Sequence, residues 1–227
     1  GTSVEVLNLK VQKREIDALW GVNGAGKTTA VILLACLLQP NGGEAFRCGK
    51  SILKDRGGVK RVVGVSPQVT AVAPNLTVEE TLRLLCGIYG YTKEKTAQKT
   101  QELVERFGLE AVLQKKAGKL SGGWQRRLSI ALALVGEPEV LFLDEPTLGL
   151  DVLARSELWD AIREMKGRVT MILTTHYMEE AEALCDRVGI LQKGRLLFSG
   201  TSAQLKEKTG KEKFEEAFLA VVREEKK

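Results

Sequence analysis

The sequence predicts an α/β fold in which helices flank a mainly parallel β-sheet. Three observations support this prediction. Short β-branched and apolar segments of strand length recur along the chain, separated by longer segments with helical periodicity. The first of the strands expected in this sheet, residues 15–20, runs into a glycine-rich turn and then into an apolar segment long enough for a buried helix. Polar residues stand at the carboxyl ends of several predicted strands, where open parallel sheets place groups that contact ligands.

Length and composition fit one sizeable domain. A chain of 227 residues can bury a core without disulfides or metals. Cys36, Cys48, Cys86 and Cys185 lie far apart and the chain has one histidine, so neither a zinc site nor a disulfide framework is expected. The net charge of +5 comes from interspersed signs, which is typical of a solvated surface and not of a nucleic-acid-binding one. The longest apolar run, 30–38, is about half of the ~20 residues of a membrane span, so we expect a soluble chain in a reducing, cytosolic setting.

The strongest motif is a glycine-rich turn between the first sheet strand and its helix. It matches the phosphate-binding pattern G-x-x-x-x-G-K-[ST] at every fixed position, as Gly21-Val22-Asn23-Gly24-Ala25-Gly26-Lys27-Thr28. The glycines let backbone N–H groups point at phosphate oxygens, and the helix N-terminus adds a partial positive charge. Lys27 is then predicted to reach the β- and γ-phosphates, and the Thr28 hydroxyl to coordinate Mg²⁺. The alternative is a glycine-rich turn that ends in Lys-Thr by chance.

Two later strands end on groups that suit hydrolysis. The strand Val140–Leu143 stops on Asp144 and Glu145, which would be a poor core but a good metal edge. Asp144 is predicted to hold Mg²⁺ through its waters, and Glu145 to orient or deprotonate the attacking water. A strand over 169–173 leads to His176 at the same sheet edge, so we interpret this histidine as catalytic, with a structural histidine as the alternative.

The remaining segments surround this core. A strand over 61–65 leads to Gln68, and the stretch between Thr77 and Gly118 predicts a helical insertion. The other expected elements are strands at 4–11 and 44–48, helices at 28–38, 78–89, 93–107 and 109–116, a long helix opening at 120–123, a hairpin at 189–198, and one or two C-terminal helices that pack on the core or on a partner.

These motifs follow one another in a fixed order: phosphate loop, glutamine, Leu120-Ser121-Gly122-Gly123, Asp-Glu pair and strand-ending histidine. This order resembles the nucleotide-binding domain of ATP-binding cassette (ABC) transporters from about residue 5 to residue 222. The resemblance implies a P-loop NTPase (RecA-like) fold with an all-helical signature subdomain and a reduced antiparallel β subdomain. It also implies one ABC ATPase domain over 1–227, divided into a nucleotide-binding core (1–68 and 137–200), the helical signature subdomain (69–136) and C-terminal helices (201–227).

The resemblance implies ATP and Mg²⁺ as cofactors and assigns roles residue by residue. Gln68 would contact Mg²⁺ and the lytic water, Glu145 would be the catalytic base, and His176 the switch histidine. The implied catalytic residues are Lys27, Gln68, Glu145 and His176; the implied nucleotide contacts are Asn23, Gly24, Ala25, Gly26, Lys27, Thr28, Thr29, Ser121, Gly122, Gly123 and Asp151; the implied metal ligands are Thr28, Gln68 and Asp144.

The segment Ser121-Gly122-Gly123 at a helix start is itself an anion site, although Lys27 already supplies one in the same chain. Two sites that share one triphosphate imply two chains, and hence a head-to-tail dimer with C₂ symmetry. By resemblance, the segment would contact the γ-phosphate of ATP held by the other monomer. The phrases at 145–151 and 175–182 resemble exporter ATPases that act on drugs, antibiotics or lipids. The expected partners are therefore a second copy or a homologous ATPase subunit and a transmembrane transporter subunit, with no nucleic acid.

A loop at the start of the insertion is the predicted contact with that membrane subunit. Residues Val69–Leu76 are apolar for a loop and precede a helix cap at Thr77. We expect this loop to line a groove that accepts a cytoplasmic helix, so that the domain is peripheral on the cytoplasmic face of a membrane. Packing of the loop on the insertion's own helices is the alternative.

The chain also departs from the family pattern. Members normally begin with two more strands that carry an adenine-stacking aromatic residue, which this sequence lacks. Asp17 stands where the family's strand is apolar, and it is expected to be exposed because a buried unpaired carboxylate costs several kcal/mol. Three functions stay open: an ATPase that drives export, a shortened or engineered domain that keeps the fold with weak or no ATPase activity, and a soluble non-transport ABC ATPase.

Overall fold

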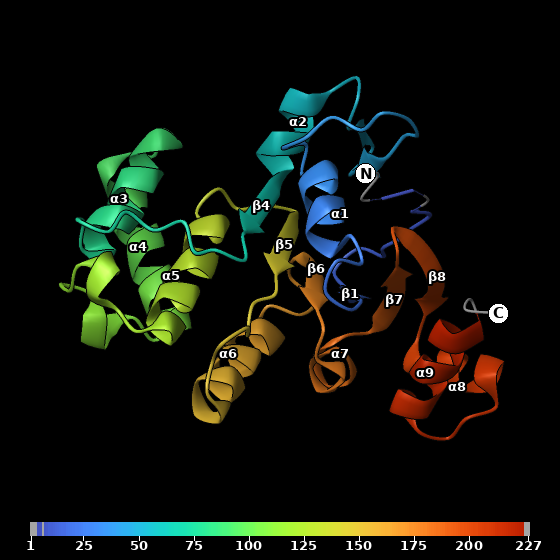
Figure 1. Cartoon of the computed structure of the whole chain (residues 1–227). Helices are drawn as coiled ribbons and strands as arrows, with labels where there is room; N and C mark the ends of the chain where they lie inside the picture. The colour runs from blue at the N-terminus through green and yellow to red at the C-terminus, as the bar shows by residue number, and fades with distance from the viewer. Residues whose placement is uncertain (1–3, 6, 225–227) are drawn as a thin grey trace.

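A six-stranded sheet forms the centre of the molecule in the computed structural model, which describes residues 4–5 and 7–224 (Figure 1). Its strand order is β4-β5-β6-β1-β7-β8, and all neighbours are parallel except the β7–β8 hairpin. The predicted mainly parallel sheet is thus confirmed. The strands are β1 (Ile16–Trp20), β4 (Val63–Ser66), β5 (Val140–Asp144), β6 (Thr170–Thr175), β7 (Arg187–Gln192) and β8 (Arg195–Gly200).

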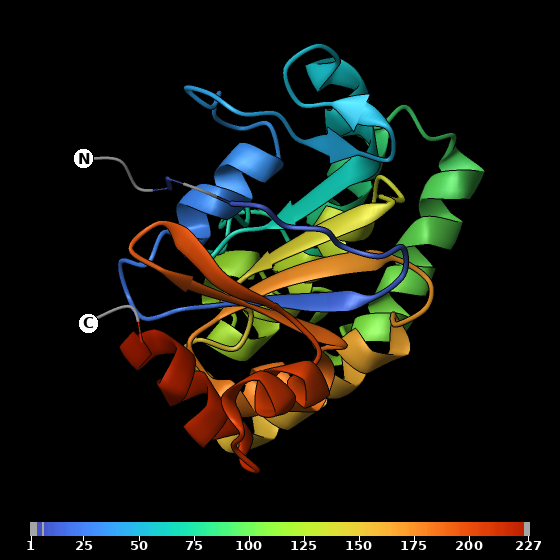
Figure 2. The same ribbon diagram turned by 90° about the vertical axis from the view of Figure 1, so that its right-hand side faces the viewer.

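Helices cover both faces of this sheet (Figure 2). On β1, Ile16, Ala18 and Trp20 point into the larger core, whereas Leu19 joins α1 in a smaller core on the other face. The rings of Trp20 and Phe218 meet edge to face with centroids 3.9 Å apart, so α9 packs on the core. The helices are α1 (Lys27–Leu34), α2 (Arg56–Val62), α3 (Val78–Ile88), α4 (Lys93–Phe107), α5 (Gly122–Leu134), α6 (Val152–Glu164), α7 (Met178–Leu184), α8 (Ser202–Thr209) and α9 (Phe214–Glu224).

Two helices of the predicted insertion between Thr77 and Gly118 are present as α3 and α4, and they lie together with the expected long helix α5 at one side of the sheet (Figure 1). Thr77 caps α3 in a reciprocal capping box with Glu80, as the sequence suggested. The expected helix over 109–116 is a 3₁₀ turn at Glu110–Val112. Gly108, with φ of 60°, ends α4 in a left-handed conformation just before it.

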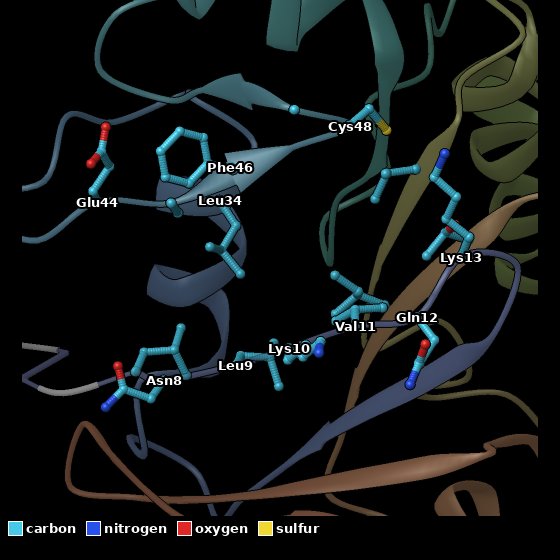
Figure 3. A pocket seen from close by; sticks show the side chains of 16 residues that line it. Asn8, Leu9, Lys10, Val11, Gln12, Lys13, Leu34, Glu44, Phe46 and Cys48 are labelled. Carbon is cyan, nitrogen blue, oxygen red and sulfur yellow. The ribbon is translucent and has the colours of Figure 1, made fainter.

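The predicted strand over 4–11 is not formed in the part of it that the structure describes. Leu7, Leu9 and Val11 still alternate toward the smaller core, which accounts for the strand-like pattern. A pocket of about 670 Å³ separates this segment from the short hairpin of β2 (Phe46–Arg47) and β3 (Lys50–Ser51), as Figure 3 shows. Without strand partners, the alternation gives an extended segment and no sheet; β2 and β3 form the small antiparallel pair.

Asp17 is buried, and the expectation that it would be exposed was wrong. Its side chain is 3% exposed because β1 is a central strand with β6 on one side and β7 on the other. The register pairs Asp17 with Arg187, yet its Oδ1 atom has no hydrogen-bond partner. Burial, reinforced by Glu15, raises the pKa of Asp17 to about 7, and Arg187 opposes the shift.

The end of α1 and the start of β4 also differ from expectation. The helix expected over 28–38 ends at Leu34, and Cys36 beyond it has a positive φ of 58°, which interrupts the apolar run. The helix α2 occupies residues that include the start of the strand expected over 61–65. Asp55 caps α2 by accepting a hydrogen bond from the Gly58 N–H at 2.8 Å, a local signal that the strand pattern masked.

Candidate active site

The glycine-rich turn curls between β1 and α1 as the motif requires. Gly24 and Gly26 adopt positive φ angles of 80° and 103°, which a side chain would strain. The Lys27 side chain is buried, and its Nζ donates to the Gly21 carbonyl oxygen at 2.7 Å. The ammonium group is therefore held inside the concave face of the turn, next to the N-terminus of α1. This arrangement of a cation and a helix N-terminus suits the binding of phosphate oxygens.

Asp144 lies at the end of β5, in contact with two threonine hydroxyls. Thr28 Oγ1 donates to Asp144 Oδ1 at 3.3 Å, and Thr174 on the neighbouring strand β6 donates to the same oxygen. Thr174 Oγ1 also accepts from the backbone N–H of Glu145 at 2.9 Å. One threonine therefore fixes both acidic residues of the Asp-Glu pair.

The residues around Thr28 fit a magnesium ion. A hydroxyl and a carboxylate are the hard oxygen ligands that Mg²⁺ prefers, and this ion keeps most of its remaining positions for water and substrate phosphates. Across the described ranges, no three His, Cys, Asp or Glu side chains cluster as a metal cage. Thr28 and Asp144 would accordingly hold the ion together with phosphate oxygens.

Glu145 occupies the centre of the site. Its Oε1 lies 3.1 Å from Lys27 Nζ, and its Oε2 lies 3.1 Å from His176 Nδ1. The residue has a positive φ of 47°, an uncommon conformation for a non-glycine residue that often marks functional sites. The carboxylate is thus aimed between a cation and an imidazole, where it can accept a proton from a water and share it with His176.

One pocket of about 730 Å³ brings most of the predicted site together. Gln68 lines it, and the buried Arg126 of α5 donates to the carbonyl oxygens of Pro67 and Gln68, both at 2.7 Å. The loop that carries Gln68, called the glutamine loop below, is therefore attached to helix α5. The lining residues are Asn23, Gly24, Ala25, Gly26, Lys27, Thr28, Thr29, Gln68, Glu145, Leu148, His176 and Lys193.

Four predicted contacts, the segment 121–123 and Asp151, are not among the residues that line this pocket. Ser121 is the exposed N-cap of α5, and its side chain makes no capping hydrogen bond. Asp151 caps α6 by accepting from the Ala154 N–H at 2.9 Å, and a Cβ on Gly123 would lie 3.4 Å from the Ala154 Cβ. The starts of α5 and α6 thus form a second cluster, separate from the phosphate loop.

Sequence reasoning missed Thr174, Arg126 and Lys193. Thr174 could have been found, because it is a polar residue near the end of the strand that leads to His176. Arg126 lies within the long helix α5, and an arginine in a helix is ordinarily solvated. Lys193 follows a hairpin strand, and only the sheet order brings that turn beside the phosphate loop.

A family model described as "ABC transporter" matches residues 4–148. The chain belongs to the ABC transporter family. It is an ABC-type ATPase domain, and the resemblance that the motif order indicated is confirmed. Within the described ranges, no helix is both long and apolar enough to cross a membrane.

The names of three relatives of this ABC domain refer to drug resistance or to transport. It is 38% identical over 209 residues to the doxorubicin resistance ATP-binding protein DrrA of Mycobacterium tuberculosis, covering 92% of this chain and 63% of that protein. It is 38% identical over 223 residues to the probable multidrug ABC transporter ATP-binding protein YbhF of Escherichia coli, covering 95% and 38%. It is 38% identical over 208 residues to the human phospholipid-transporting ATPase ABCA3, covering 92% and 12%. The chain therefore spans only part of each of these proteins.

Solved structures share the fold over almost the whole chain. The ATP-binding subunit of an ABC transporter superposes with a TM-score of 0.86 at 29% identity, covering 97% of this chain and 93% of that one. The ATP-binding cassette MJ0796, in a dimeric post-hydrolysis state bound to ADP and Pi, superposes with a TM-score of 0.79 at 25% identity, covering 88% and 90%. The predicted fold class is confirmed by both.

Proposed function

We propose that this ABC domain binds ATP with Mg²⁺ in the pocket of the phosphate loop and hydrolyses it to drive transport. The observation that carries the proposal is the convergence of Lys27, Glu145 and His176, with distances of 3.1 Å from Glu145 to each of the other two. Thr28 and Asp144 lie beside them, joined by a hydrogen bond of 3.3 Å. Phosphoryl transfer to water needs a cation, a base and ligands for magnesium, and all three lie at this site.

Each of these side chains has a role in the proposed reaction. Lys27 binds the β- and γ-phosphates and offsets their charge. Glu145 accepts a proton from the attacking water, whose oxygen bonds to the γ-phosphorus as the bond to the β–γ bridging oxygen breaks. His176 positions the carboxylate, and Gln68, which lines the pocket, would contact bound Mg²⁺ and the attacking water. Bound Mg²⁺ would offset the charge on the phosphates.

The second cluster supports a head-to-tail dimer. Ser121 is the N-cap of α5, and Ser121 and Gly122 are both exposed, so this helix N-terminus suits a phosphate from outside the chain's own phosphate loop. Beside Asp151, the side chains of Val152 and Leu153 are 81% and 70% exposed, an apolar patch that suits burial between two chains. We propose that this face closes over the phosphate loop of a second copy or a homologous subunit, so that two nucleotides lie in the interface.

The partner in the membrane is proposed to be a transmembrane transporter subunit, which places the domain at the cytoplasmic face. The loop predicted to contact it divides in the structure: Val69 is 83% exposed, whereas Val72 packs against the larger core. Part of the predicted groove is therefore core packing, and Val69 becomes the candidate contact. Export of drugs, antibiotics or lipids is the finer proposal, and the names of DrrA, YbhF and ABCA3 support it.

A domain with weak nucleotide affinity is the second candidate. Among the described residues that line the pocket, none is Phe, Tyr or Trp, so the adenine lacks a stacking ring of these types there. Stacking on an aromatic side chain contributes roughly 1–3 kcal/mol per base in nucleic-acid sites, by alanine substitution. In this second candidate, the catalytic groups are in place and ATP binds weakly.

The test is ATP turnover and ATP-dependent dimerisation of the purified chain and of Glu145→Gln. We expect the variant to retain ATP, to form the dimer and to lose turnover by orders of magnitude, because it keeps the shape and lacks the base. Glu164→Gln changes an exposed glutamate of α6 outside the pocket and should behave as wild type. Undiminished turnover in Glu145→Gln would reject the assigned base, and saturation of wild type only at millimolar ATP would favour the second candidate.

A further inference from the structure

Lys193 lies at the rim of the same pocket, on the turn between β7 and β8. The turn is fastened to the phosphate loop, because the Gly194 N–H donates to the Ala25 carbonyl oxygen at 2.9 Å. The N-terminal segment holds it from the other side, since the Glu5 N–H donates to the Gly194 carbonyl oxygen at 2.8 Å. The backbone of Lys193 is therefore fixed relative to the loop, and its side chain is presented to the pocket.

The conformation of this turn is an unusual one for a lysine. Lys193 and Gly194 have φ angles of 46° and 79°, as in the two-residue type I′ hairpin turn, where asparagine, aspartate or glycine is favoured at the first position. A long side chain in this left-handed conformation carries a local energetic cost. The turn would form more readily with asparagine, so the lysine is explained better by what its ammonium does than by turn geometry.

The sheet order places Lys193 opposite the hydrolytic residues. Gln68, Glu145 and His176 follow β4, β5 and β6, which all lie on one side of β1, and Lys193 follows β7 on the other side. Because Glu145 and His176 mark the γ-phosphate end, a nucleotide that leaves the loop toward β7 carries its α-phosphate to Lys193. Within the described ranges, Lys193 has no carboxylate partner at ion-pair distance, whereas Lys27 is paired with Glu145.

We propose that Lys193 is a second phosphate-binding cation, which contacts the α-phosphate of a nucleoside di- or triphosphate held by the loop. The inference rests on the proposed binding of ATP at this site and adds a residue to it. Lys193 acts on nucleotide binding and not on the hydrolytic step. It also compensates in part for the lack of a phenylalanine, tyrosine or tryptophan among the described lining residues.

The test is calorimetric binding of ATP and of ADP to wild type, Lys193→Asn, Lys193→Gly and Lys193→Arg. Asparagine and glycine both favour the turn and remove the charge, so the melting temperature should not fall. We expect Kd to rise about three- to tenfold for both nucleotides, as for loss of one partly solvated charge-assisted hydrogen bond. Lys193→Arg should stay close to wild type. Lys211→Asn, which removes an exposed charge outside the pocket, is the matched control.

The results separate this inference from the function on which it rests. An equal loss for ATP and ADP with normal melting supports a contact with a phosphate that both nucleotides carry, as the α-phosphate is. A loss for ATP alone would move the contact to the γ-phosphate and overturn the assignment, and unchanged Kd values in both charge-removing variants would reject it. If wild type binds neither nucleotide, the proposed function fails and the inference fails with it.

Discussion

Lys27 and Glu145 form an ion pair between the phosphate loop and the end of β5, with Nζ 3.1 Å from Oε1 and both side chains less than a tenth exposed. Two buried charges of opposite sign each lower the cost of burying the other, so removal of one leaves the other uncompensated. The pair therefore links the stability of the fold to the two residues that the proposed chemistry uses most directly. Stability and nucleotide binding can be separated by changing them singly and together.

Lys27→Ala should lower ATP affinity tenfold or more, because it removes a buried charge-assisted contact worth roughly 1.5–3 kcal/mol. It should also destabilise the chain by about 3–5 kcal/mol, since Glu145 stays buried without its partner. Adding Glu145→Gln should restore part of the melting temperature and none of the affinity. Calorimetric binding and thermal unfolding of Lys27→Ala, Glu145→Gln and the double variant measure both effects. If the double variant melts no higher than Lys27→Ala, the pair is not the source of the loss.

Thr174→Val should weaken the metal site while preserving the shape of the side chain. The hydroxyl donates to Asp144 and accepts from the Glu145 N–H, so valine removes one hydrogen bond from each of them. Thr28 still donates to Asp144, and the Thr174 carbonyl oxygen still accepts from the Glu145 N–H. We expect a loss of roughly 1–3 kcal/mol in unfolding free energy and a higher Mg²⁺ concentration for half-maximal ATPase activity. Thr170→Val, at the other end of β6, is the control and should leave the Mg²⁺ dependence unchanged. An unaltered Mg²⁺ requirement in Thr174→Val would show that Asp144 does not need this contact.

Much of the fold and of the pocket could be predicted because their signals are local. The phosphate loop, the strand that stops on Asp144 and the cap at Thr77 each depend on residues within a few positions of one another. The prediction of a strand over 4–11 was wrong, because alternation indicates which side chains face the core and not whether a neighbouring strand exists. The prediction that Asp17 is exposed was wrong for a related reason. Its burial is determined by β6 and β7, which lie far along the chain.

In the candidate site, too, residues with a local sequence signal could be predicted and residues placed by tertiary contacts could not. The Gly26-Lys27-Thr28 end of the loop has a sequence pattern with a physical mechanism, so its place could be predicted. The Lys193 turn and Arg126 reach the site through tertiary contacts, namely a hydrogen bond from Gly194 to Ala25 and two from Arg126 to the glutamine loop. No short-range pattern encodes either contact.

Asp17→Asn should stabilise the domain at neutral and alkaline pH. Burial raises the pKa of Asp17 to about 7, so between pH 4 and pH 7 the unfolded chain releases this proton while the folded chain keeps it. The stability of wild type therefore falls as pH rises through this range, by up to about 1.4 kcal/mol per pH unit from this group. Urea unfolding from pH 4 to pH 8 should show this slope in wild type and a flatter one in Asp17→Asn.

The neighbours of Asp17 decide how much of that slope appears. Glu15 and Asp186 raise the pKa of Asp17, and Arg187 lowers it, so all three charges are kept in the comparison. Asp160→Asn, which alters a carboxylate that is 65% exposed, should leave the slope in place. If wild type and Asp17→Asn show the same pH dependence, the carboxyl group is ionised in the folded chain, and Arg187 compensates for its burial.

The loop that follows Gln68 gives the sharpest test of coupling to a membrane partner, because two valines three positions apart have opposite environments. Val69 is 83% exposed, and Val72 packs against the larger core. In the isolated domain, Val69→Glu should leave melting temperature and ATPase activity unchanged, whereas Val72→Glu should lower the melting temperature, since it places a charge against apolar side chains. In the complete transporter, Val69→Glu should reduce transport while ATP hydrolysis continues. Normal transport with Val69→Glu would remove this residue from the contact, and loss of stability with it would show that the exposed part of the loop is also core.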